Sequence, residues 1–200
     1  MSSEVVLVPG LWMPAAAMGL LGRRLGAAGF RARHFAYAGR ASFADNLRRL
    51  AAFLDGRRAH LVGHSLGGVL ILDVLRDPAL PVASALLLGA PVRGCLAGRR
   101  LGAHAVGRWM MGGCVECWRE RDARWPRAEP LGVIAGTAPI GLGRLLGRLP
   151  DESDGVVRVE ETAVEGMAAR ALVPLGHSML IFSRGVAQLA ARFMREGRFA

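Results

Sequence analysis

Residues 60 to 70 read HLVGHSLGGVL, a run in which a polar, glycine-rich centre separates two apolar segments. Residues 63–67 fit the pattern G-x-S-x-G, AHLVG (59–63) has the composition of a buried strand, and residues 66–75 indicate an apolar helix. In a strand–turn–helix context, this pattern holds a serine in a strained backbone conformation above the end of a sheet. We therefore expect Ser65 to be a nucleophile. The alternative is a glycine-rich turn with a serine that caps the helix.

The rest of the chain alternates short β-rich runs with helical patterns, which predicts a mainly parallel sheet with helices on both faces. The expected strands are VVLV (5–8), FRARHFAY (30–37), AHLVG (59–63), ASALLLGAP (83–91), LGVIAG (131–136) and ARALVPL (169–175). Three further expected helices carry apolar residues at helical spacing: Met18, Leu21, Leu25 and Ala28; Phe43, Leu47, Leu50 and Leu54, with Ser42 as N-cap; and Phe182, Val186, Leu189 and Phe193. We expect a single domain over residues 1–200, a three-layer α/β/α sandwich with a reduced sheet.

Residues 92–130 interrupt this alternation, because they contain no clear strand and exceed the length of a single crossover. We interpret them as a crossover helix plus a small helical cap. Cys114 and Cys117 have C-x-x-C spacing, with Cys95 and His104 nearby, so a zinc site is one interpretation. Reduced structural thiols are the interpretation we favour.

The 200 residues carry a formal net charge of +10, and all 26 basic residues are arginine. These arginines are dispersed, some of them as adjacent pairs, and no aromatic platform accompanies them, which argues against nucleic-acid binding. Attraction to anionic lipid headgroups or anionic substrates explains such a charge better than nucleic-acid binding does. The N-terminus lacks a basic region, and the longest apolar stretches, around residues 82–92, fall short of the ~20 residues of a membrane span. We therefore expect a soluble, cytoplasmic protein without a signal peptide.

A serine nucleophile needs a base, and His177 is the best placed of the five histidines. It follows the last expected strand in VPLGHSML, at the carboxyl end of the sheet, where open α/β folds place their sites. His64 adjoins the serine, but successive side chains diverge in a tight turn. His34 and His60 lie at expected strands, and His104 lies in the insertion, residues 92–130.

The base in turn needs an acid that holds its tautomer. The segment LPDESDGVVRVEET (149–162) offers Asp151, Glu152 and Asp154 between the last two expected strands. Asp154 precedes a glycine and two valines, so the chain turns sharply there and re-enters apolar packing. We favour Asp154 as this acid, with Asp151 next.

Acyl transfer also needs backbone amides that stabilise an oxyanion. The amide of Leu66 directly follows the serine. The loop VPGLWMP (8–14) should provide the second donor, because Gly10 lets the backbone approach; Leu11 is the favoured residue and Trp12 the alternative.

The residues expected around the mouth of the site are apolar, with core packing as the alternative for each. They are Leu11, Trp12, Met13, Leu66, Met179 and Leu180. As a set they favour a substrate with an apolar acyl group; Trp12, Met13 and Met179 are the candidate substrate-binding residues. The stretch IGLGRLLGRL (140–149) could contact a lipid surface, although a short amphipathic helix packed on the core explains it equally well.

The segments VLVPGLW, LVGHSLGG, SDGVV and LGHSML together resemble the α/β-hydrolase superfamily, and most of all its compact bacterial lipases and esterases. The resemblance spans residues 5–195 apart from the insertion. It implies Ser65 as nucleophile, His177 as general base and Asp154 as orienting acid, with no metal and no organic cofactor. Two features depart from the pattern: the oxyanion loop reads Pro-Gly where many relatives have His-Gly, and the chain begins at a strand that larger relatives reach after two others.

The expected reaction is hydrolysis of a small-molecule carboxylic ester or lipid through an acyl-enzyme. A thioesterase or acyltransferase with the same triad is the first alternative. A protein that binds a small molecule in such a pocket without catalysis is the second.

Overall fold

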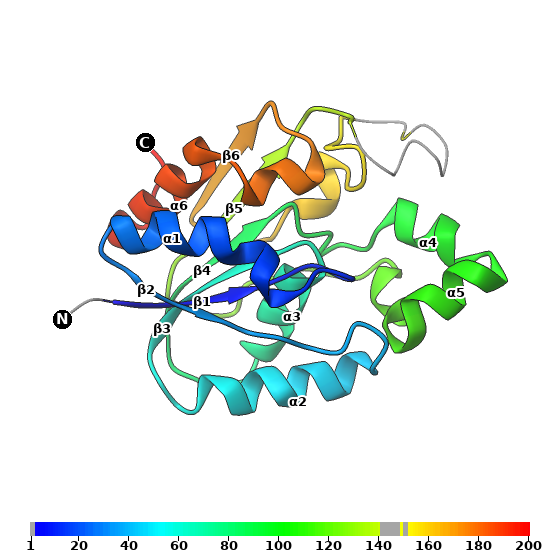
Figure 1. Ribbon diagram of the computed structural model, residues 1–200, viewed down its shortest axis with the longest axis horizontal. Coiled ribbons are helices and arrows are strands. Elements are labelled where there is room, and N and C mark those ends of the chain that lie inside the picture. The colour runs from blue at the N-terminus through cyan, green and yellow to red at the C-terminus, as the bar shows by residue number, and fades with distance from the viewer. Residues whose placement is uncertain (1–2, 141–148, 150–151) are drawn as a thin grey trace.

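The computed structural model describes residues 3–140, 149 and 152–200. Its centre is one six-stranded sheet in the order β2-β1-β3-β4-β5-β6, with every neighbouring pair parallel (Figure 1). The strands are β1 (Glu4–Val8), β2 (Arg31–His34), β3 (Ala59–His64), β4 (Val82–Leu88), β5 (Leu131–Gly136) and β6 (Ala169–Val173). All six predicted strands are confirmed, and the predicted edge strand is indeed at the edge, shortened to the four residues of β2.

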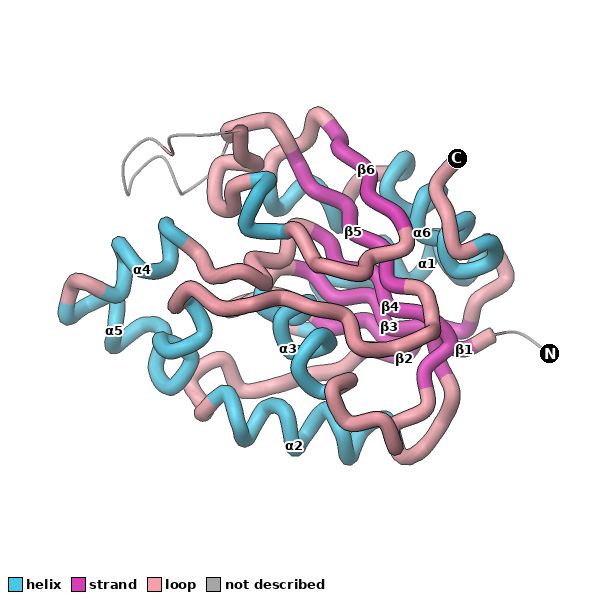
Figure 2. The backbone as a smooth tube through the Cα atoms, turned by 180° about the vertical axis from the view of Figure 1, so that it is seen from behind, coloured by secondary structure: helices cyan, strands magenta, loops and turns pink. Residues whose placement is uncertain are grey.

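The sheet is covered on both faces, which explains why its central strands are continuous apolar runs. Alternate residues of β1 show the division: Val5 and Leu7 belong to one core cluster, and Val6 and Val8 to the other. The first cluster includes residues of α1 (Gly19–Ala27) and α6 (Arg184–Glu196), and the second includes residues of α2 (Phe43–Leu54) and α3 (Leu66–Val74). Figure 2 shows these layers from behind. The predicted three-layer sandwich is confirmed.

Serine side chains cap the N-termini of two helices. The Ser42 Oγ accepts a hydrogen bond from the Asp45 amide at 3.0 Å, as predicted for the start of α2. The C-terminal helix starts later than its apolar pattern suggested. The Ser183 Oγ accepts from the Val186 amide at 3.3 Å and begins α6 after Phe182, which instead follows the 3-10 turn η5 (His177–Ile181).

The segment between β4 and β5 contains α4 (Leu96–Gly102), α5 (Ala105–Met111) and the 3-10 helix η2 (Gly112–Trp118). In Figure 1, α4 and α5 lie beyond the carboxyl ends of the strands, and η2 contacts α2. The three cysteine thiols are free and buried, and no group of three or more His, Cys, Asp or Glu side chains in the described part of the chain is arranged to hold a metal. No helix among the described residues is long and apolar enough to cross a membrane. Most of the stretch that we considered for lipid contact, residues 141–148, lies outside the described residues.

Candidate active site

Ser65 lies in the turn between β3 and α3 with a backbone conformation that side chains rarely adopt. Its φ is 53° and its ψ is −124°, and its amide donates to the carbonyl of Leu88 at the end of β4 (2.9 Å). It stands at the N-cap position of α3, but its side chain makes no capping hydrogen bond within the described structure. The serine is therefore strained without stabilising the helix, which is typical of a site rather than of a cap.

The two glycines of the pattern are there because the backbone segments touch. A Cβ on Gly63 would lie 2.6 Å from the carbonyl carbon of Gly67, and a Cβ on Gly67 would lie 2.3 Å from the carbonyl oxygen of Val8. Any side chain at either position would push α3 away from the sheet. These contacts give the physical reason for G-x-S-x-G in this chain.

His177 and Asp154 meet although they are separated by a strand. The Nδ1 of His177 lies 2.7 Å from the Oδ2 of Asp154, and the His177 amide donates to the Asp154 carbonyl at 2.9 Å. Both side chains are buried. A carboxylate only accepts hydrogen bonds, so the proton lies on Nδ1 and leaves Nε2 with a free lone pair. Asp151, the alternative acid, lies outside the described residues.

A tight turn fixes the direction of the Asp154 carboxylate. Its Oδ1 accepts hydrogen bonds from the amides of Val156 (3.0 Å) and Val157 (2.7 Å), and the Asp154 amide donates to the Val157 carbonyl at 3.1 Å. One oxygen is thereby occupied by the backbone, and the other faces His177.

Gly89, which directly follows β4, lies beside Asp154 and His177. A Cβ built on it would lie 3.0 Å from the Oδ2 of Asp154 and 3.3 Å from the Nδ1 of His177, and Gly89 follows Leu88, whose carbonyl accepts from Ser65. The structure thus joins Asp154 to His177 and places both, like Ser65, at the carboxyl ends of neighbouring strands. The ring of His64, the residue before Ser65, contacts His177, but among the described residues no hydrogen bond joins the Ser65 hydroxyl to His177. The sequence reasoning missed Gly89; a glycine immediately after a buried strand was the available signal.

His64 contributes to the site in a way that the sequence did not indicate. Its ring packs against the His177 ring with centroids 4.6 Å apart, and its Nε2 lies 3.1 Å from the His177 carbonyl oxygen. Burial, followed by the neighbouring His177, lowers the pKa of His64 to about 3. His64 is therefore neutral at ordinary pH, donates through Nε2 and holds the backbone of His177.

Two amides are placed near Ser65 as potential oxyanion donors. The amide of Leu66 is the first of α3, so it has no intrahelical acceptor. On the opposite loop, a Cβ built on Gly10 would lie only 3.1 Å from the Cβ of Ser65, which places the amide of Leu11 one residue beyond this close approach. The Tyr37 hydroxyl donates to the Pro9 carbonyl at 3.1 Å and braces the loop.

The three expected substrate-binding residues differ in exposure. Trp12 and Met179 are both 51% exposed, whereas Met13 is partly buried and packs against the core cluster of α1 and α6. The indole Nε1 of Trp12 donates to the carbonyl of Met110 in α5 at 3.0 Å, so the loop after β1 is tied to the helical segment. For the side chains of Leu66 and Leu180, core packing was the correct alternative, since both are fully buried.

No family model matches the sequence, and neither does any curated protein. Among solved structures, the chain is similar to the mature form of the lipase BlEst2 of Bacillus licheniformis, with a TM-score of 0.71 and 18% identity over 97% of this chain and 91% of that chain. It is also similar to an esterase of Thermogutta terrifontis (TM-score 0.68, 14% identity, 97% and 90% covered). An extracellular α/β-hydrolase of a Paenibacillus species gives a TM-score of 0.61 at 14% identity, with 96% and 97% covered. Together with the all-parallel sheet and the turn at Ser65, these similarities show that the chain has the compact α/β-hydrolase fold.

Proposed function

We propose that the protein hydrolyses carboxylic esters through an acyl-enzyme on Ser65, with His177 as general base and Asp154 as orienting acid. The observation that carries the proposal is the hydrogen bond between the Nδ1 of His177 and Asp154, at the same end of the sheet as the strained turn that holds Ser65. The lipase and the esterase with similar structures support the reaction class.

The proposed cycle follows from the tautomer of His177. Its unprotonated Nε2 takes the proton of the Ser65 hydroxyl while the oxygen attacks the ester carbonyl, and Asp154 stabilises the imidazolium that forms. The amides of Leu66 and Leu11 would stabilise the tetrahedral oxyanion; one such donor is typically worth about 3–4 kcal/mol of the barrier. His177 then protonates the leaving alcohol, and a water molecule repeats the sequence to release the acid.

The proposed substrates are small-molecule esters with an apolar acyl group. Trp12 and Met179 support this choice, because they expose large apolar surfaces on the two segments that flank the site. A lipid ester fits the same description.

Labelling with a fluorophosphonate probe tests the nucleophile, and p-nitrophenyl esters of increasing chain length test the reaction. We expect Ser65→Ala to abolish both labelling and hydrolysis. The control variant is Ser178→Ala, which replaces an exposed serine beside His177 and should retain both. A folded wild-type protein that is not labelled would instead support non-catalytic binding. A preference for thioesters over matched esters would replace the esterase by a thioesterase.

A further inference from the structure

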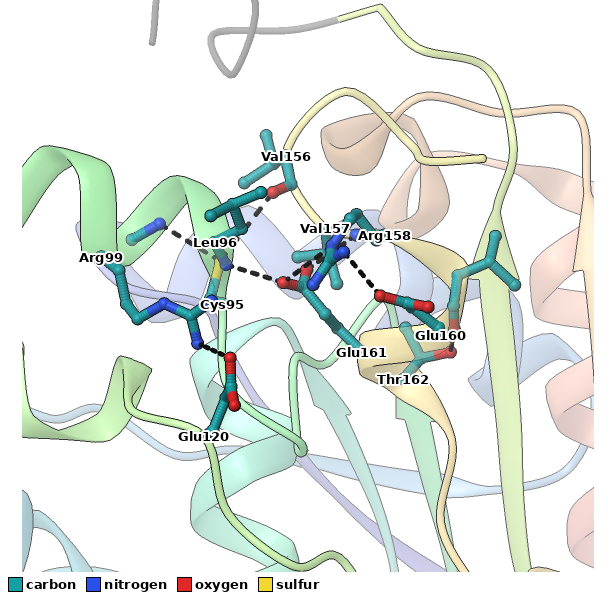
Figure 3. Close-up of polar contacts among 12 residues, drawn as sticks. Cys95, Leu96, Arg99, Glu120, Val156, Val157, Arg158, Glu160, Glu161 and Thr162 are labelled. Atoms are coloured by element: carbon teal, nitrogen blue, oxygen red, sulfur yellow. Dashed lines mark hydrogen bonds and ion pairs between the residues drawn. The ribbon is translucent and has the colours of Figure 1, made fainter. Parts of the chain in front are cut away.

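Glu161 is a buried carboxylate that the proposed reaction does not use. It lies in the 3-10 turn η4 (Val159–Thr162), seven residues after Asp154, and only 4% of it is exposed. Its Oε1 accepts from the amide of Leu96 at 2.7 Å, and its Oε2 accepts from the amide of Arg158 at 2.9 Å (Figure 3). The Nε of Arg158 lies 3.2 Å from Oε1, so the carboxylate has a cationic partner as well.

On one side, Glu161 closes the turn that orients Asp154. Val157, whose amide donates to the Oδ1 of Asp154, directly precedes Arg158, whose amide is bound by Glu161. Ser153 and Arg158 also form an antiparallel bridge across the base of this turn. The Glu161 carboxylate therefore holds the end of the five-residue turn whose amides fix the catalytic carboxylate.

On the other side, Glu161 binds the start of the segment between β4 and β5. Leu96 is the first residue of α4, and the amide of Arg93 donates to the Glu161 carbonyl at 3.0 Å. In Figure 3, Cys95 and Leu96 lie directly opposite Val156 and Glu161. The chain that leaves β4 is thus hydrogen-bonded to the segment that carries Asp154.

We propose that Glu161 is a positioning residue, which aligns Asp154 with His177 by joining the 154–158 turn to the first amide of α4. This inference rests on the proposed function. A carboxylate suits the task because both of its oxygens are acceptors, and Glu161 uses each of them on a different segment. A glutamine can satisfy only one of the two amides and presents an NH2 group to the other.

The central experiment compares Glu161→Gln with Glu160→Gln. Glu160 is the matched control, since its side chain is 61% exposed and forms an ion pair with the Nη1 of Arg158 at 2.6 Å. We expect Glu161→Gln to lower kcat by about 10- to 100-fold, the effect of a small misplacement of a catalytic group, with KM nearly unchanged. Glu160→Gln should leave both constants unchanged.

A spectroscopic measurement separates alignment from turnover. The proton between His177 and Asp154 should give a far-downfield NMR resonance that His177→Ala removes. We expect Glu161→Gln to shift or broaden this resonance and Glu160→Gln to leave it in place. The resonance can change in Glu161→Gln even if the wild-type protein neither hydrolyses esters nor reacts with the fluorophosphonate. In that case the proposed function fails and the positioning role stands.

A second pair of variants removes the other partner of the carboxylate. Leu96→Pro deletes the amide that donates to Glu161, at the first helical position, where proline is well tolerated. The preceding Cys95 has φ −134° and ψ 113°, an extended conformation of the kind favoured before proline. Leu96→Ala controls for the lost side chain, and we expect the kcat of Leu96→Pro to be several-fold lower.

The proposal is overturned if folded Glu161→Gln keeps the wild-type kcat and the downfield resonance. Should that variant fail to fold, the leucine pair decides: equal kcat and equal resonances in Leu96→Pro and Leu96→Ala would show that the contact does not position Asp154.

Discussion

Replacing Ser65 by glycine should stabilise the protein relative to replacing it by alanine. Both substitutions remove the hydroxyl, so both should abolish hydrolysis under the proposed function. They differ in strain, because the φ of 53° and ψ of −124° at Ser65 remain unfavourable for alanine and are readily adopted by glycine.

The expected difference follows from two opposing contributions. A non-glycine residue held in a sparsely populated backbone region costs about 1–3 kcal/mol. Glycine relieves that strain but gives up about 0.5–1 kcal/mol, because the unfolded chain gains backbone freedom. The net expectation is about 1 kcal/mol in favour of Ser65→Gly, which corresponds to a Tm difference of about 2–4 °C for a chain of this length.

Thermal and urea unfolding of the two variants measure this difference directly. Ser84 provides the control pair, because it is a buried serine within β4 and is not among the residues with positive φ. There Ser84→Gly should be less stable than Ser84→Ala by about 0.5–1 kcal/mol. The strain argument is refuted if Ser65→Gly is no more stable than Ser65→Ala.

Three further predictions concern the residues around the serine. The pKa of His64 in the folded protein, about 3, lies below its ordinary value of 6.5, so the contribution of neutral His64 to stability is present above pH 6.5 and is lost as the pH falls towards 3. Between pH 7 and pH 5, the free energy of unfolding measured with urea should therefore fall by about 2 kcal/mol less in His64→Gln than in the wild type. Gly67→Ala should cost about 2–3 kcal/mol in thermal unfolding and lower activity, since its Cβ would lie 2.3 Å from a backbone oxygen, whereas Gly19→Ala, with nothing within 4 Å, should be neutral or stabilising. Trp12→Phe removes the bond to the Met110 carbonyl and should lower kcat/KM about fivefold, the equivalent of about 1 kcal/mol; an unchanged kcat/KM would mean that this bond does not support the loop.

The sheet could be predicted from the sequence because strands buried on both faces leave uninterrupted apolar runs, such as VVLV and LGVIAG. The turn at Ser65 could also be predicted, because close backbone contacts exclude side chains at Gly63 and Gly67 and so leave a recognisable glycine pattern. The C-terminal helix boundary was less so, since the apolar pattern continued through Phe182 while the Ser183 cap started the helix two residues later.

Contacts between distant segments that belong to no recognised motif could not be predicted, because the identity of one residue does not reveal its partner. His64 was excluded as the base because its side chain diverges from that of Ser65, but nothing in the sequence indicated that its ring packs on His177, 113 residues away. Glu161 was not singled out in the segment 149–162, and only the fold places it against Leu96. Both side chains form hydrogen bonds to backbone atoms, and a backbone partner leaves no trace in the sequence.

The division of the Asp154 oxygens has a consequence for amide substitution at that position. The amides of Val156 and Val157 both donate to Oδ1 of Asp154. In Asp154→Asn, the side-chain carbonyl would therefore have to occupy that position, and the NH2 group would point at the imidazole of His177. His177 would then have to receive a hydrogen bond at Nδ1 and carry its proton on Nε2, so under the proposed function Nε2 could no longer accept a proton from Ser65. Exchanging one oxygen for an NH2 group, with the shape of the side chain preserved, would thus reverse the direction of the hydrogen bond between residue 154 and His177.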